Sequence, residues 1–120
     1  MEATVARVKY VHIAPRKLRL VADLVRGKKV AEARSILHFN TREGAVAIGK
    51  ALASAVANAE SRALETRERI NTDDMVVSLV RVDGGPTVYR YRSAARGRGM
   101  SIRKRCSHIE LFIAEKGKKK

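Results

Sequence analysis

The sequence predicts an α+β protein: a small three-stranded antiparallel sheet packed with three helices, from which a long β-hairpin protrudes. Apolar residues recur at helical spacing between residues 15 and 63, and they alternate with other residues in three further segments. A basic segment of 25 residues separates the last two alternating segments. We expect residues 1–120 to form a single domain, because a chain of this length supports one compact core.

The N-terminal residues predict a strand followed by a helix. Thr4–Val11 is rich in β-forming residues. Pro15 suits the first turn of a helix, and Gly27 can adopt the left-handed conformation that ends one. A first helix is therefore expected over Pro15–Arg26, with apolar positions at Leu18, Val21, Leu24 and Val25.

A second helix is expected after Lys28 and Lys29, ending near His38 or Phe39. Its apolar stripe consists of Val30, Ala33, Ile36 and Leu37.

The third helix is expected to be the longest and to form the centre of the scaffold. Asn40 can cap it, and Glu43, three residues on, completes an arrangement that resembles a capping box. Its frequent alanines favour helix and allow close approach of other elements, so no chemistry is assigned to it. The inward positions are Ala45, Ile48, Leu52, Val56, Ala59 and Ala63.

From Ile70 the period changes to two, which predicts a second strand that continues through Val82. Met75, Val77 and Leu79 are expected on one face, and Val76, Ser78 and Val80 on the other. A last strand, His108–Ile113, alternates Ile109, Leu111 and Ile113 with Glu110 and Phe112. We expect these two strands to pair as an antiparallel hairpin.

The charge of the chain points to a polyanionic partner. Lys and Arg number 26 against 12 Asp and Glu, giving a formal net charge of +14. Residues 1–40 carry +6, residues 41–89 carry −1 and residues 90–120 carry +9. Two cationic regions on a neutral scaffold favour nucleic acid over a membrane surface.

The segment Asp83–Ser107 is far longer than the usual hairpin loop of two to five residues. We interpret residues 83–107 as an extension of the hairpin, roughly 40 Å long at about 3.3 Å per residue. The sequence suggests no apolar set on either face, so a partner would have to fold these arms. The alternative is a disordered, solubilising loop.

The cations of this segment identify that partner as an RNA or DNA backbone, since no acidic residue interrupts them. Tyr89 and Tyr91 beside them suit stacking on unpaired bases. The candidate contacts are Arg90, Arg92, Arg96, Arg98, Arg103, Lys104 and Arg105.

Two other basic groups are candidates for phosphate binding. Arg16, Lys17 and Arg19 lie in the first turns of the first helix, where the helix dipole adds to their attraction for phosphate. Residues 116–120 form a basic tail without a specific geometry, which includes Lys118, Lys119 and Lys120.

Catalytic and metal-binding patterns are poor. His12, His38 and His108 could supply the acid and base of a nuclease, but three dispersed histidines in a basic protein are usually structural. Cys106 and His108 lack the further ligands that a zinc site needs. We therefore expect no catalytic residue, no metal and no cofactor.

The sequence predicts a cytoplasmic protein. The N-terminus lacks an apolar run typical of a signal peptide, and no stretch approaches the length of a membrane span. The lone Cys106 suits a reducing compartment.

Four segments together cover almost the whole chain and closely resemble large-subunit ribosomal protein twenty-two. They are APRKLRLVADLVRGKKVAEA at Ala14–Ala33, SAVANAE at Ser54–Glu60, VDGGP at Val82–Pro86 and ARGRGMSIRKRCSHIELFI at Ala95–Ile113. The last is the most specific, with Gly97, Arg98, His108, Ile109, Leu111 and Ile113 at the positions of the family's C-terminal signature. Just before it, where the family usually has Pro-Arg, this sequence has Ser93 and Ala94.

The resemblance implies a structural protein on the outer face of the large ribosomal subunit that binds rRNA and aids assembly. Its hairpin would reach through rRNA to line the nascent-peptide exit tunnel, with a tip formed by Tyr89, Arg90, Tyr91, Arg92, Ser93 and Ala94. The cations of the arms would bind rRNA, as would Arg16, Lys17, Lys28 and Lys29 from the globular part. The implied partners are rRNA, neighbouring large-subunit proteins and the nascent peptide, with no membrane and no homo-oligomer.

Two other functions are compared with this one. A nucleoid-type DNA-binding protein would share the charge but usually shows a dimerisation surface or a groove-reading helix. A nuclease would need the histidines to act together. The sequence does not distinguish a bacterial ribosome from that of an organelle.

Overall fold

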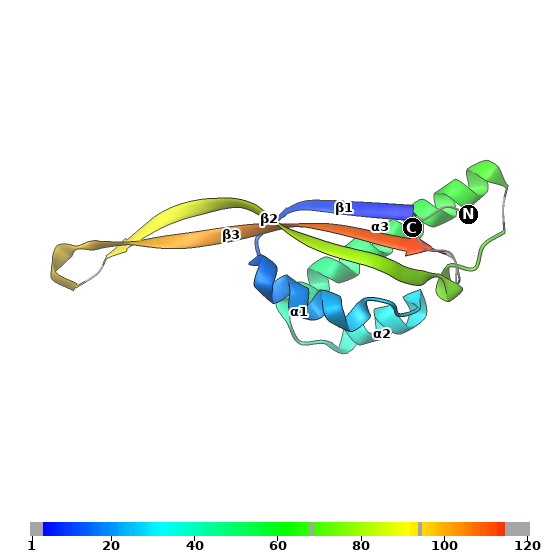
Figure 1. Ribbon diagram of the computed structural model, residues 1–120, viewed down its shortest axis with the longest axis horizontal. Coiled ribbons are helices and arrows are strands. Elements are labelled where there is room, and N and C mark those ends of the chain that lie inside the picture. The colour runs from blue at the N-terminus through cyan, green and yellow to red at the C-terminus, as the bar shows by residue number, and fades with distance from the viewer. Residues whose placement is uncertain (1–3, 68, 94, 115–120) are drawn as a thin grey trace.

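Three helices lie against one face of a three-stranded antiparallel sheet, and two of the strands continue far beyond it (Figure 1). The computed structural model describes residues 4–67, 69–93 and 95–114. The sheet order is β1-β3-β2. This arrangement confirms the predicted α+β fold. The elements are β1 (Thr4–Val11), α1 (Pro15–Val25), α2 (Val30–Phe39), α3 (Glu43–Thr66), the 3-10 turn η1 (Thr72–Asp74), β2 (Val76–Ser93), the 3-10 turn η2 (Ala95–Gly97) and β3 (Gly99–Ala114).

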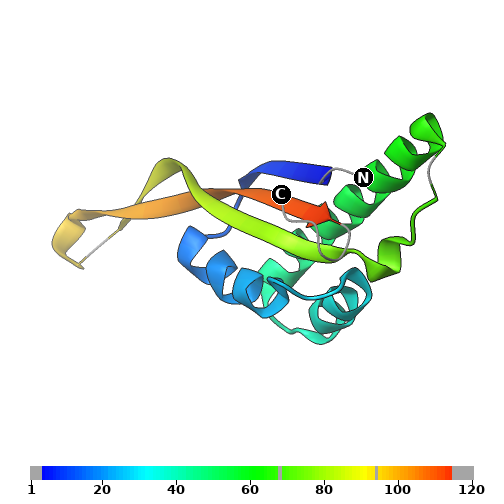
Figure 2. The same cartoon turned by 45° about the vertical axis from the view of Figure 1, so that its right-hand side comes forward.

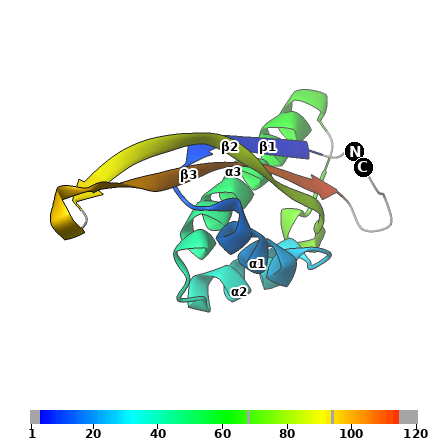
Figure 3. The ribbon, with the colours of Figure 1, turned by 60° about the vertical axis from the view of Figure 1, so that its left-hand side comes forward.

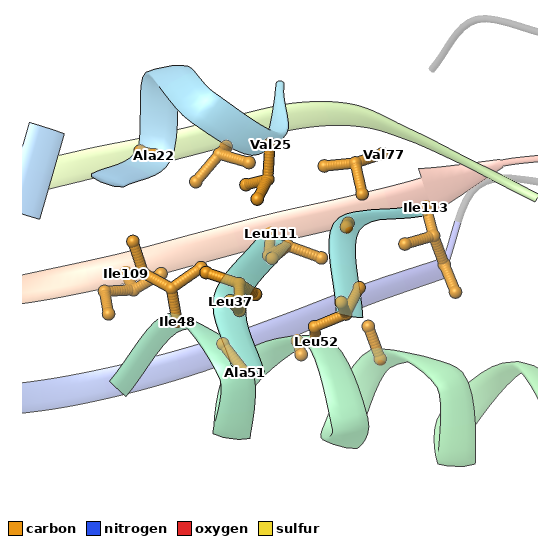
Figure 4. Packing of buried hydrophobic residues seen from close by; sticks show 14 of the residues in the cluster. Ala22, Val25, Leu37, Ile48, Ala51, Leu52, Val77, Ile109, Leu111 and Ile113 are labelled. Atoms are coloured by element: carbon orange, nitrogen blue, oxygen red, sulfur yellow. The ribbon is translucent and has the colours of Figure 1, made fainter. Parts of the chain in front are cut away.

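The core lies between the helices and the C-terminal half of β3, the central strand. Ile109, Leu111 and Ile113 alternate along β3 and are almost fully buried. They join one cluster with Leu37 of α2 and Leu52 of α3 (Figure 4). Burial of each such side chain contributes about 1.5–3 kcal/mol, so this half of β3 anchors the sheet to the helices. The inward positions predicted for the third helix, from Ala45 to Ala63, are all buried.

The start of α3 differs from the prediction. The N-cap is Arg42, and no side chain caps the first turn. The side-chain oxygen of Asn40 instead accepts a hydrogen bond from the Arg42 backbone N–H at 2.8 Å. Asn40 therefore shapes the turn before the helix and does not form a capping box with Glu43. The predicted role of Gly27 agrees with its left-handed φ of 82° just beyond α1.

Two details of β2 also differ from the prediction. The strand begins at Val76 and not at Ile70, because Asn71 accepts a hydrogen bond from the backbone N–H of Asp73 and starts η1. The pairing of β2 with β3 then shifts register between Val77 and Leu79. This irregularity adds one residue and reverses the alternation, so the buried positions are Val77, Val80 and Val82.

Side chains of α1 and of Arg26, which follows it, cover the outer edge of β2. The Arg19 guanidinium donates to the Val82 carbonyl at 3.0 and 3.3 Å, and Arg26 donates to the Val80 carbonyl at 2.8 Å. These bonds satisfy edge carbonyls that would otherwise be open to another strand. They also turn this side of α1 toward the sheet edge. The apolar face predicted for the helix differs at one position: Leu24 is 43% exposed, and Ala22 is buried in its place.

The long segment between the last two strands is a β-ladder, which confirms the predicted hairpin extension. β2 and β3 pair from Val76 opposite Ala114 to Ser93 opposite Gly99. We call the outer part of this ladder, Thr87–Ser93 with Ala95–Arg105, the finger. It extends away from the helices in every view, and the molecule measures 66 × 27 × 19 Å (Figures 2 and 3).

Two glycines of α3 give opposite predictions for stability. A Cβ at Gly44 would lie 3.1 Å from Leu18 Cδ2 and 3.3 Å from Val21 Cγ2, whereas a Cβ at Gly49 meets no atom within 4 Å. Gly44→Val should lower the free energy of unfolding by about 1–3 kcal/mol through overpacking against α1. Gly49→Ala should raise it by about 0.5–1 kcal/mol through helix propensity. Urea unfolding of both variants measures this, and an equally stable Gly44→Val protein would contradict the close α1–α3 contact.

Candidate nucleic-acid interface

The register of the ladder gives the finger two chemically different faces. Residues directly opposite each other place their side chains on the same face. Tyr89 lies opposite Arg103, and Thr87 lies opposite Arg105. This tyrosine face therefore combines ring surfaces with guanidinium groups, and Tyr89 and Tyr91 are 56% and 82% exposed.

The opposite face combines cations with aliphatic side chains. Arg90 lies opposite Ile102, and Arg92 lies opposite Met100. Val88, paired with Lys104, continues this aliphatic face toward the sheet. The prediction that neither face has an apolar set is wrong, because Val88, Met100 and Ile102 come from both arms and share a face through the register of the ladder.

A cleft on the aliphatic side of the finger opens against the start of α1 and has a volume of about 430 Å³. It brings Lys17 of α1 together with the finger cations Arg90 and Lys104. Glu43, in the first turn of α3, also lines this cleft. Its carboxylate is favoured there by the positive end of the α3 dipole.

A second cleft of about 350 Å³ opens on the tyrosine side. It is lined by Arg16 at the start of α1, by Tyr89 and by the finger cations Arg103 and Arg105. No side chain caps the first turn of α1, so its positive end adds to this cationic surface. Such a set of planar donors beside an exposed ring can bind phosphate and stack on a base.

The other predicted cations lie elsewhere or have protein partners. Arg19 lines the second cleft, but its guanidinium is bonded to the Val82 carbonyl. Lys28 and Lys29 lie at the opposite end of α1, where the Lys28 carbonyl accepts from the Val77 N–H at 2.9 Å. The structure therefore groups Arg16 and Lys17 with the finger and places Lys28 and Lys29 apart from it.

The tip is closed by η2, where Arg96 and Gly97 have left-handed φ values of 61° and 73°. Arg98 follows this turn and lines a shallow hollow of about 260 Å³ together with Tyr91 and Ser93. Ala94 of the predicted tip and the basic tail at 116–120 lie outside the described residues.

Each of the three histidines contacts a neighbouring side chain or backbone group. His12 lies 3.6 Å from the Cys106 sulfur, His38 contacts the Phe39 ring edge-on, and His108 accepts a hydrogen bond from the Tyr10 backbone. Within residues 4–67, 69–93 and 95–114, no three His, Cys, Asp or Glu side chains form a group that could hold a metal ion. In the same ranges, no helix has the length and apolar character to cross a membrane.

Comparison with known proteins assigns the family. Residues 6–114 match the sequence profile of ribosomal protein L22p/L17e. The chain is 49% identical over 111 residues to large ribosomal subunit protein uL22 of Pediococcus pentosaceus, covering 92% of this chain and 90% of the relative. It is 50% identical over 108 residues to uL22 of Rubrobacter xylanophilus, covering 90% and 81%. The uL22 of Acidothermus cellulolyticus is longer: the match is 45% identical over 108 residues and spans 90% of this chain but 38% of that protein.

The profile match extends from β1 through the finger to the end of β3, so it includes both the helical scaffold and the cationic surface described above. With matches of this length and identity, the chain belongs to the ribosomal protein L22p/L17e family.

Proposed function

We propose that this chain is a structural component of the large ribosomal subunit and that its finger and the start of α1 bind rRNA. The observation that carries the proposal is the state of the seven finger cations, Arg90 to Arg105. Within the described part of the chain, no ion pair joins any of them to a carboxylate. A cationic surface of this density is stabilised when phosphates replace the missing counter-charges.

The two faces of the finger suit different contacts with RNA. On the tyrosine face, Tyr89 and Tyr91 can stack on unpaired bases while Arg103 and Arg105 bind phosphates. At its base, the two clefts place Arg16 and Lys17 where they can hold the same RNA segment that follows the finger. The proposed site therefore clamps rRNA between α1 and the finger.

The family membership supports further proposals about the place of this protein. The domain would lie on the outer face of the subunit, in a cytoplasmic ribosome, and aid assembly by joining rRNA segments. The tip around Tyr91 and Arg92 would help line the exit tunnel and lie near the nascent peptide. Neighbouring large-subunit proteins would complete its contacts, with no homo-oligomer, and the role is structural and not catalytic.

The affinity of the purified protein for a large-subunit rRNA fragment should fall steeply with salt. If six to ten phosphates are engaged, the association constant should drop roughly a thousandfold or more between about 50 and 200 mM salt. Fluorescence anisotropy measures this directly. A nearly flat response would contradict the proposal, and equal affinity for random duplex DNA would favour a nucleoid-type DNA-binding protein instead.

Arg105 and Arg19 should respond differently to the same substitution. Arg105→Gln removes a finger cation, so the log–log salt slope should become shallower by about 0.7–0.9 while the free energy of unfolding stays unchanged. Arg19→Gln should lower the free energy of unfolding by about 1 kcal/mol, because the Val82 carbonyl loses its donor. A reduced salt slope with unchanged stability for Arg19→Gln would place Arg19 among the RNA contacts.

Amide exchange should report which part of the finger depends on RNA. In the free protein, residues 89–93 and 99–103 should exchange almost as fast as an unfolded chain, because neither face is covered by protein. Amides of α3 around Leu52 and Val56 should stay protected, and added rRNA should slow the exchange of the finger. Strong protection across these finger residues without RNA would show that the finger is stable alone.

A further inference from the structure

Both neighbours of β3 are irregular at the level where the finger leaves the sheet. In β1, Val8 pairs with Ile109 and Val11 with Ser107, so two residues of β1 lie opposite His108. In β2, Gly84 pairs with Ser107 and Thr87 with Arg105, so two residues lie opposite Cys106. Such bulges bend a strand and change its direction.

The His108 side chain contacts both of these irregular segments. Its Nδ1 accepts a hydrogen bond from the Tyr10 backbone N–H at 3.1 Å, and its ring meets the Tyr10 ring edge-on at 5.1 Å. Tyr10 has a φ of 59°, a conformation that costs energy for a residue with a side chain. The hydrogen bond from Tyr10 to His108 therefore helps to hold a strained backbone in β1.

On the other side, the imidazole lies against the backbone of β2. A Cβ built on Gly85 would lie 3.2 Å from both Cε1 and Nε2 of His108, and 3.3 Å from the Cys106 carbonyl oxygen. A side chain here would be in tight contact with the ring, so the ring or the backbone would have to shift by a few tenths of an ångström. One side chain of the central strand thus contacts the bulged backbone of both edge strands.

Ser107, next to His108, joins the opposite face of β3 to the segment before α1. The Ser107 hydroxyl, fully buried, donates to the Ile13 carbonyl at 2.5 Å, in the segment that joins β1 to α1. Beyond this level, no hydrogen bond or ion pair joins the finger to the helices within the described part of the chain. The direction of the finger is therefore determined at this junction.

We propose that His108 is a positioning residue that sets the direction in which the finger leaves the sheet, by holding the bulges of β1 and β2 against β3. The significance of that direction rests on the proposed function, since RNA threaded between α1 and the finger needs a fixed geometry at the base. The orientation itself is a property of the free protein and is measured without RNA.

Residual dipolar couplings of backbone amides test this in the free protein with all 120 residues. In the unmodified protein, the couplings of Thr87, Val88, Lys104 and Arg105 should fit the same alignment tensor as those of α3. In His108→Leu, which removes the Nδ1 acceptor, the couplings of these four residues should become smaller than the α3 tensor predicts, because the finger base then samples several orientations relative to the sheet. The couplings of α3 should not change. His108→Asn, whose side-chain oxygen can accept from Tyr10, should restore part of the loss.

A second variant tests the contact with β2 without changing the histidine. Gly85→Ala places a methyl group 3.2 Å from Cε1 and Nε2 of His108, which should displace the ring and reduce the same four couplings. Gly99→Ala is the matched control, because a Cβ there meets no atom within 4 Å, and it should leave them unchanged.

Full-size couplings in both His108→Leu and Gly85→Ala would overturn the proposal, as would averaged couplings at the finger base of the unmodified protein. Loss of α3 couplings together with those of the finger would also overturn it, because His108 would then support the whole fold. Salt-dependent rRNA binding by the unmodified protein is measured separately, so its absence would contradict the proposed function and leave this result standing.

Discussion

The structure depends on one constraint: β3 must pair with β2 both inside the core and far outside it. Its C-terminal half carries Ile109, Leu111 and Ile113 into the helical layer, where burial drives folding. Its N-terminal half carries Arg103, Lys104 and Arg105 into solvent. Because β2 and β3 pair along their whole length, the exposed half of β3 continues from the half that packs on the helices. The packing of the helices on the sheet therefore determines where the cations lie.

This division also explains how the protein carries a net charge of +14. On the sheet face away from the helices, Glu110 lies 3.8 Å from Arg7 and 3.9 Å from Arg81. Asp83 lies 4.0 Å from Arg81 in the same cluster. Exposed pairs of this kind contribute at most about 1 kcal/mol each, but they offset repulsion next to the core. The finger has no such pairs within the described residues, and under the proposed function RNA phosphates would balance its repulsion.

Much of the fold could be predicted because its signals are local. The helical period predicted six of the buried positions of α3 between Ala45 and Ala63 but missed Ala51 and Ala55, and β1 has the predicted bounds Thr4–Val11. What could not be predicted depends on pairing between distant segments. Beyond the bulge between Val77 and Leu79, the buried and exposed positions of β2 are exchanged, and no feature of the sequence indicates the extra residue. The placement of β1 beside β3, and the shared face of Val88 and Met100, likewise follow from register alone.

In the candidate site, too, features with a local sequence signal could be predicted and those that depend on tertiary contacts could not. Composition identified the finger cations, because a run of seven without an acid is visible in the sequence. It also predicted Arg19, and the structure adds that the Arg19 guanidinium donates to the Val82 carbonyl of the neighbouring strand. The sequence predicts no specific contact for His108, because its contacts with Tyr10 and Gly85 depend on the tertiary structure.

Site-specific photo-crosslinking in assembled ribosomes tests most directly whether the finger contacts large-subunit rRNA. A photoreactive amino acid would replace Tyr91 on the finger, and in a separate variant Leu64, which is exposed near the C-terminal end of α3 away from the finger. If the finger binds rRNA, we expect a crosslink from position 91 to large-subunit rRNA that is much stronger than any RNA crosslink from position 64. Equal RNA crosslinking from both positions, or none from position 91, would contradict it.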